Sequence, residues 1–142
     1  MSDMSYKELY LTQSPMIVSP DDKSDPVSNI FGVPFDSTHS YKPGCRFGPD
    51  VIRDAFNNIE IFHPNLQVDL EIANIKDYGN IQHTVVATEM LEMVEKITNE
   101  LRKEKKPLVI LGGEHLLTLG SYMSFPKAVS YTHLTLPTNR EV

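Results

Sequence analysis

The chain has 142 residues, of which 40% are hydrophobic and 23% are charged, which is enough for one modest domain with a hydrophobic core. Its formal net charge of −6 argues against a nucleic-acid-binding surface, and no stretch is apolar for long enough to cross a bilayer. The first residues lack the basic and apolar regions of a targeting signal, so we expect a cytoplasmic protein.

Residues 1–27 are rich in Ser, Asp and Pro, and their prolines interrupt any periodic pattern. Most of this segment has too little apolar surface to offset the entropy that it would lose on ordering. We therefore expect an N-terminal arm, in which the apolar residues 16–18 are the part most suited to docking on a core.

A first strand is predicted over residues 27–35. Asp36 follows its carboxyl end, where the sequence fits a functional carboxylate and equally an Asx turn that accepts loop amides.

The loop over residues 37–48 is dense in residues that turn the backbone or reach outward. Within it, Pro43-Gly44 suits a type II turn. Cys45, the single cysteine of the chain, is interpreted as a small turn residue rather than a nucleophile.

A helix is predicted to follow this loop. Gly48 is a suitable N-cap, and Pro49 fits the first helical position because an N–H there would have no helical partner. The carboxylate of Asp50 is favourable at the positive end of the helix dipole. The residues expected on the apolar face of this helix are Val51, Ile52, Ala55 and Phe56.

A second strand is predicted over residues 68–75, where polar and apolar residues alternate as they do in a strand with one face exposed to water. The longest helix is predicted from about residue 81 to residue 105, with Asn80 as its N-cap and Pro107 after its end. Apolar residues recur along it at steps of three and four, so we interpret its methionines as core residues rather than a binding surface.

The third predicted strand, Leu108–Leu111, is apolar throughout and leads into Gly112-Gly113, which indicates a central strand that ends in a tight turn. Glu114 and His115 follow at its carboxyl end. Ligands of open α/β sheets bind at this end of the strands, so His115 is a candidate metal ligand. The series of strands and helices predicts an α/β fold with a parallel sheet in the strand order 2-1-3.

Four segments carry a resemblance to a known family. They are Ile30–Asp36, Tyr41–Pro49 with Ile52-Arg53, Asp77–Asn80 and Gly112–His115. In this order they resemble the N-terminal half of the ureohydrolase family of agmatinases and arginases, most of all the archaeal type of agmatinase, over roughly residues 7–126. The resemblance implies an incomplete three-layer αβα arginase-like sandwich, with residues 28–127 as the N-terminal part of its domain.

The resemblance also implies a chemistry. In that family, two manganese ions activate a water that attacks the guanidinium carbon of a small cationic substrate, agmatine in the agmatinases, and urea and an amine are released. Such enzymes belong to polyamine metabolism, and we expect the complete protein to be a homo-oligomer that binds neither nucleic acid nor membranes.

The resemblance assigns roles to several residues. His115 corresponds to a metal ligand, Glu114 to a partner that orients it, and Gly112 and Gly113 to the glycines that shape the approach. The candidates for the rim of the active site are His39, Tyr41 and Arg46. For His39 the alternative is a solvated loop histidine, and for Arg46 it is a salt bridge to Asp50 or Asp54.

The chain departs from the family beyond residue 127. Neither the Asp-x-His-x-Asp motif nor the Asp-x-Asp motif that complete the dinuclear site is present. Residues 128–142 resemble the translated read-through of a sequencing adapter, and His133 within them lacks the flanking aspartates of a metal site. Leu116 replaces the small polar residue that usually follows the motif histidine. We therefore predict a fragment of an agmatinase-like hydrolase that is inactive on its own.

Two alternatives remain open from the sequence. A non-catalytic α/β module could hold an anion at the Gly112-Gly113 turn, although Glu114 in that turn would repel a phosphate. A subunit-interface fragment without ligand chemistry is the other alternative.

Overall fold

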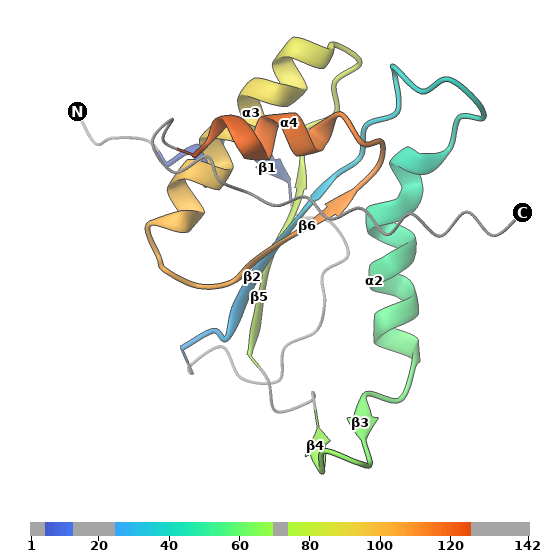
Figure 1. Cartoon of the computed structure of the whole chain (residues 1–142), viewed down its shortest axis with the longest axis vertical. Coiled ribbons are helices and arrows are strands. Elements are labelled where there is room, and N and C mark those ends of the chain that lie inside the picture. The colour runs from blue at the N-terminus through green and yellow to red at the C-terminus, as the bar shows by residue number, and fades with distance from the viewer. Residues whose placement is uncertain (1–4, 13–24, 70–73, 126–142) are drawn as a thin grey trace, which may run out of the picture.

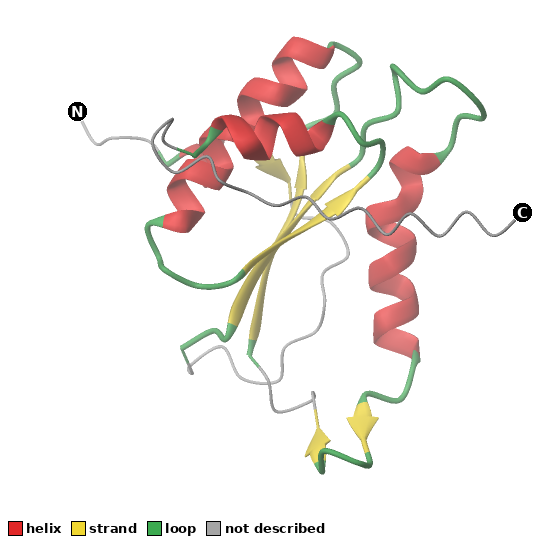
Figure 2. Cartoon of the chain, in the orientation of Figure 1, coloured by secondary structure: helices red, strands yellow, loops and turns green. Residues whose placement is uncertain are grey.

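The computed structural model describes residues 5–12, 25–69 and 74–125, which form a sheet with helices on both faces (Figure 1, Figure 2). The strands of this sheet are β1 (Leu11–Thr12), β2 (Ser28–Val33), β5 (Ile75–Ile81) and β6 (Leu108–Gly112). Their order is β1-β5-β2-β6, in which β2 pairs in parallel with β5 and β6, and β1 pairs antiparallel with β5. The three parallel strands thus stand in the predicted order 2-1-3, and β1 adds an edge strand that was not predicted.

The helices lie in two layers. On one face of the sheet α3 (Ala87–Arg102) packs against α4 (Leu117–Met123), and α2 (Gly48–Asn58) lies on the other face (Figure 1). The remaining elements are α1 (Tyr6–Tyr10), which contacts α3, the short helix η1 (Cys45–Phe47), and a small hairpin of β3 (Phe62–His63) and β4 (Val68–Asp69). The α/β class predicted from the sequence is therefore confirmed.

The core lies between the sheet and α3. Its buried side chains come mainly from β2 and α3, and they include Phe31, Val33, Met90, Val94, Ile97 and Leu101, all without exposed surface. Burying one such side chain contributes about 1.5–3 kcal/mol to folding. Met90 and Met93 belong to this core, which confirms the interpretation of the helix methionines.

Two predicted boundaries were wrong. The second strand of the parallel sheet is Ile75–Ile81 rather than residues 68–75, because Asp77 and Asn80, which look like turn residues, are buried within the strand. The long helix consequently begins at Ala87, with Val86 at its N-cap, and not after Asn80.

Two predictions about the positions of apolar residues were also wrong. Leu108–Leu111 was expected to be central, but β2 is the central strand, and β6 pairs with β2 alone among the described strands. In α2, Val51 and Ile52 are exposed, whereas the buried residues are Pro49 and Arg53. In the expected N-terminal arm, α1 and β1 pack on α3 and β5, because Tyr10 and Leu11 contact the core cluster. The apolar residues 16–18 lie outside the described residues.

Candidate functional site

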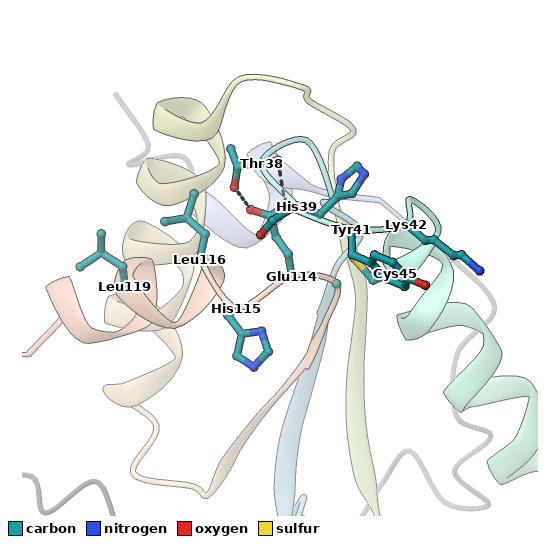
Figure 3. Close-up of a pocket in the computed structure, with 11 residues that line it drawn as sticks. Thr38, His39, Tyr41, Lys42, Cys45, Glu114, His115, Leu116 and Leu119 are labelled. Carbon is teal, nitrogen blue, oxygen red and sulfur yellow. Dashed lines mark hydrogen bonds between the residues drawn. The ribbon is translucent and has the colours of Figure 1, made fainter. Parts of the chain in front are cut away.

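A pocket of about 620 Å³ lies at the carboxyl ends of β2 and β6. Two segments far apart in the sequence form its walls: the loop after β2 and the turn after β6 that leads into α4 (Figure 3). The lining residues are Thr38, His39, Ser40, Tyr41, Lys42, Cys45, Gly113, Glu114, His115, Leu116 and Leu119. The parallel pairing of β2 with β6 brings these segments together, because Val33 and Gly112 stand opposite each other in the register.

The turn after β6 is held directly against the segment after β2. The amide of Gly113 donates to the carbonyl of Val33 at 3.0 Å, and the amide of Glu114 donates to the carbonyl of Phe35 at 3.0 Å. A Cβ atom at Gly113 would lie 2.1 Å from the Phe35 carbonyl oxygen. Glycine is therefore required at position 113 by the close approach of two backbones.

Glu114 is buried, with 8% of its surface exposed, and its carboxylate is bound by Thr38. One carboxylate oxygen accepts the Thr38 amide at 2.9 Å, and the other accepts the Thr38 hydroxyl. Figure 3 shows these two contacts and shows the His115 ring directed away from Glu114. The hydrogen bonds of this carboxylate thus join the turn after β6 to the loop after β2.

His115 is exposed and lines the pocket at the start of the turn into α4. Its exposure leaves the imidazole accessible to a ligand or a metal ion. Within the part of the chain that the structure describes, no group of three or more His, Cys, Asp or Glu side chains is placed to hold a metal ion. The described residues therefore supply one candidate ligand and do not by themselves form a dinuclear centre.

The predicted rim residues lie in different positions. His39 and Tyr41 line the pocket, and Tyr41 is the more open, with 84% of its surface exposed. The Nδ1 atom of His39 lies within hydrogen-bonding distance of the Asp36 carbonyl oxygen. Arg46 is not among the lining residues; it pairs with Asp36 at 3.4 Å rather than with Asp50 or Asp54.

Asp36 organises the loop. The amide of Gly44 donates to its carboxylate at 2.8 Å, and this hydrogen bond, with the Arg46 charge, holds the pKa of Asp36 below its usual value. The structure therefore favours the loop-stabilising role of Asp36 over the role of a free functional carboxylate. In the same loop, burial raises the pKa of the Cys45 thiol, and the charges of Asp36 and Glu114 raise it further.

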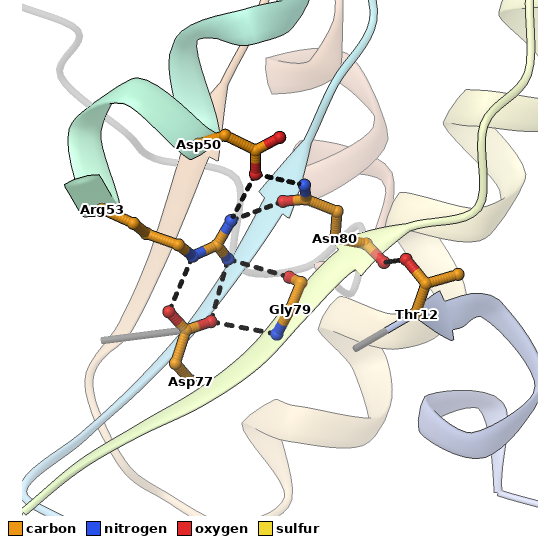
Figure 4. Close-up of polar contacts among 6 residues, drawn as sticks. All are labelled: Thr12, Asp50, Arg53, Asp77, Gly79 and Asn80. Carbon is orange, nitrogen blue, oxygen red and sulfur yellow. Dashed lines mark hydrogen bonds and ion pairs between the residues drawn. The ribbon is translucent and has the colours of Figure 1, made fainter. Parts of the chain in front are cut away.

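A buried polar network fixes α2 against the sheet (Figure 4). Arg53 donates to both carboxylate oxygens of Asp77, at 2.7 and 2.8 Å, and to the side-chain oxygen of Asn80 at 2.6 Å. Asn80 in turn donates to Asp50 at 2.8 Å. Gly32 of β2 makes room for the network, because a Cβ atom there would lie 1.9 Å from the Asn80 oxygen.

Sequence reasoning did not single out this network or Thr38. The family resemblance was the available signal for the network, because the segments that carry it include Arg53, Asp77 and Asn80. Thr38 carried no signal of its own, because its contact with Glu114 spans 76 positions of the chain.

Comparison with known proteins identifies relatives of this chain. Residues 28–136 match the model of the Arginase family. The N(1)-aminopropylagmatine ureohydrolase of Thermococcus kodakarensis is 37% identical over 121 residues, which are 79% of this chain and 41% of that protein. An agmatinase of Pyrococcus horikoshii is 36% identical over 91 residues, covering 63% of this chain and 32% of that protein.

A solved structure supports the same relationship. The agmatine ureohydrolase of Thermoplasma volcanium superposes with a TM-score of 0.71 at 28% identity, covering 81% of this chain and 40% of that one. The chain therefore spans about one third to two fifths of the length of these relatives.

The family match reaches residue 136 and so includes part of the expected tail. Residues 126–142 lie outside the described residues. Within the described ranges, every helix is too short or too polar to cross a membrane.

Proposed function

Because the chain belongs to the arginase family, we propose that it is the N-terminal section of an agmatinase-type ureohydrolase. The complete enzyme would hydrolyse a guanidino C–N bond and release urea and an amine. Agmatine is the substrate that we propose first, and N(1)-aminopropylagmatine is the second because a relative at 37% identity is named for it. We also propose a cytoplasmic homo-oligomer for the complete protein.

The position of His115 carries this proposal. Its imidazole is exposed to the pocket at the carboxyl end of β6, where parallel α/β sheets bind their ligands. A neutral imidazole can bind a divalent metal ion, and manganese in addition prefers oxygen ligands such as carboxylates. Two manganese ions would supply an activated water and charge stabilisation in the complete enzyme.

The described residues do not complete such a centre, since His115 is the only assigned ligand and no cluster of three ligand side chains is present among them. The contribution of this section is the shape of one wall of the pocket, one imidazole, and the loop that carries His39 and Tyr41. The remaining ligands would belong to the part of the relatives that this chain does not span.

The test compares the chain with a chimera. Residues 1–127 are joined to the corresponding continuation of the Thermococcus kodakarensis relative, and urea release is measured with manganese and agmatine, N(1)-aminopropylagmatine, arginine or 4-guanidinobutyrate. The chimera should release urea, and the chain alone should not. His115→Ala should abolish the activity, whereas His63→Ala, at an exposed residue of the β3–β4 hairpin, should not.

Urea release by the chain alone would contradict the proposal that the remaining metal ligands lie outside this chain. A folded chimera that binds manganese and hydrolyses none of the four compounds would contradict the family function proposed for this section.

A further inference from the structure

We propose that Glu114 is a positioning residue that holds the pocket loop (residues 36–47) to the turn that carries His115. This role rests on the proposed function only in that the pocket is taken to be the active-site pocket. It differs from the role that the motif suggested for Glu114, which was to orient the His115 imidazole. The observation that carries it is the pair of hydrogen bonds from Thr38 to both oxygens of the Glu114 carboxylate.

The burial of Glu114 makes these contacts necessary. Only 8% of the surface of the Glu114 residue is exposed, so its carboxylate has lost much of its hydration and requires hydrogen-bond donors from the protein. Thr38 supplies them from its amide and its hydroxyl, although Thr38 itself is exposed. Hydrogen bonds to an ionised acceptor are about twice as strong as neutral ones. The loop is therefore held near its beginning by a charge on another segment.

The polar contacts of the Asp36 carboxylate are made within the loop itself. This carboxylate accepts the Gly44 amide at 2.8 Å and pairs with Arg46. They give the loop its shape but do not connect it to the turn after β6. Among the described side chains on the pocket wall, Glu114 and Thr38 form the hydrogen bonds that do connect them.

The consequence for the pocket is geometric. The backbone of Glu114 is fixed to Phe35, which precedes the loop, by a 3.0 Å hydrogen bond, and its carboxylate accepts two hydrogen bonds from Thr38, so the beginning of the loop is held to the residue before His115. His39 and Tyr41 follow Thr38 directly on the same wall of the pocket. Glu114 thus sets the distance between the loop side chains and the imidazole of His115.

Cys45 provides a built-in reporter for this arrangement. It is the only cysteine in the sequence, it is half-buried, and it lines the same pocket on the same loop. The experiment measures the rate at which a chromogenic aromatic disulfide reacts with Cys45 in the full chain, at low protein concentration and without metal or substrate. Opening of the loop exposes the thiol and accelerates the reaction.

Thr38→Val is the decisive variant, because it removes the hydroxyl donor, leaves the Glu114 charge in place and changes an exposed residue. Its reaction rate should rise about tenfold, as expected for the loss of one hydrogen bond to a charged group. Thr38→Ser keeps the hydroxyl and should react at the rate of the unaltered chain. Thr118→Val makes the same chemical change at an exposed position on α4 and should also leave the rate unchanged.

Glu114→Gln should accelerate the reaction as well, but part of that effect would come from the lower pKa of the Cys45 thiol once a nearby negative charge is lost. The rate is therefore measured as a function of pH, and the limiting rate of the thiolate is compared. An increase in this limiting rate reports loop opening.

Equal rates for Thr38→Val and the unaltered chain would overturn the proposal, and so would equal acceleration by Thr38→Ser and Thr38→Val. Loss of the helical circular-dichroism signal in Thr38→Val, with retention in Thr118→Val, would show a requirement for folding and would also overturn the positioning role. None of these results depends on urea release, so the chimera experiment tests the proposed function separately.

Discussion

Arg53 on α2 and Asp77 on β5 form a bidentate ion pair inside the protein, with the Arg53 Nε atom 2.7 Å from Oδ2 of Asp77. Both side chains are almost fully buried, so neither charge is hydrated. The pair crosses β2 at Gly32, whose missing side chain leaves space for the guanidinium and for Asn80. It connects the helix on one face of the sheet to the strand beyond β2.

Asp77→Asn should destabilise the fold by about 3 kcal/mol, because it removes the buried partner of the guanidinium and leaves Arg53 only the half-exposed carboxylate of Asp50 at 3.6 Å. The measurement is the free energy of unfolding from a urea titration followed by circular dichroism. Glu92→Gln is the matched control, since it breaks the exposed ion pair between Glu92 and Lys96 on α3 and should produce no measurable change. Equal stability of the two variants would contradict the importance of the buried pair.

The same network explains which parts of the fold the sequence could predict. β2 and β6 are short apolar runs, and the stripe of apolar residues in α3 follows the helical period, so local patterns were sufficient to place them. β5 was placed several residues too early because Asp77 and Asn80 are polar, and their burial depends on Arg53 on a distant helix. The local alternation of polar and apolar residues contains no information on such a pairing.

The candidate site likewise has features that local sequence patterns predict and features that depend on contacts between distant segments. The position of His115 at the end of a strand followed from the apolar run and the two glycines. The contact between Glu114 and Thr38 did not, because it arises only when β2 and β6 pair in register. The prediction that Leu108–Leu111 is central was wrong for a related reason: an all-apolar strand is expected to have neighbours on both sides, and the described sheet supplies β2 alone.

Glu104 should make the stability of the chain depend on acidic pH. Burial opposes its ionisation, but hydrogen bonds from Lys7 at 2.6 Å and Asn29 at 2.8 Å outweigh this and lower its pKa below 4.5. A carboxylate whose pKa is lower in the folded state contributes stability above its unfolded pKa, and that contribution is lost as the pH falls through the folded value. The expected loss therefore lies below about pH 4.5.

This prediction is checked by urea titrations over an acidic pH series. Glu104→Gln should be less stable than the unaltered chain near neutral pH, and the difference should shrink as the pH falls below 4.5. Glu60→Gln removes the same charge from an exposed position and should leave the pH profile unchanged. A constant difference between Glu104→Gln and the unaltered chain at every pH would contradict the assignment.

The edge of the sheet at β6 should cause self-association of the isolated chain. Val109 on β6 is 43% exposed, and Ile52 on α2 and Leu119 on α4 are each 46% exposed, so apolar side chains are uncovered in all three layers. An unprotected strand edge with apolar surroundings pairs readily with other chains. Sedimentation velocity should therefore show concentration-dependent oligomers or aggregates.

Val109→Lys should reduce this association, because a charge on an edge strand opposes pairing between chains. Lys76→Arg, on β5, keeps its charge and serves as the control. A monomer that unfolds in one sharp and reversible thermal transition would contradict the prediction of an exposed and unstable edge.

Deletion of residues 128–142 should leave the helix content and the solubility of the chain unchanged. In the described elements up to residue 125, apolar periodicity, turn residues and charge placement all favour the same α/β fold, which is typical of a segment selected to fold. The sequence of residues 128–142 has no apolar periodicity that would pack against these elements. The family match to residue 136 makes the outcome informative, since residues 128–136 would contribute to folding if they belonged to the domain. Circular dichroism and sedimentation of the full and the shortened chain provide the measurement, with deletion of residues 137–142 alone as the control. Loss of helical signal in the longer deletion but not in the shorter one would show that residues 128–136 are part of the domain and that the family match marks its true extent.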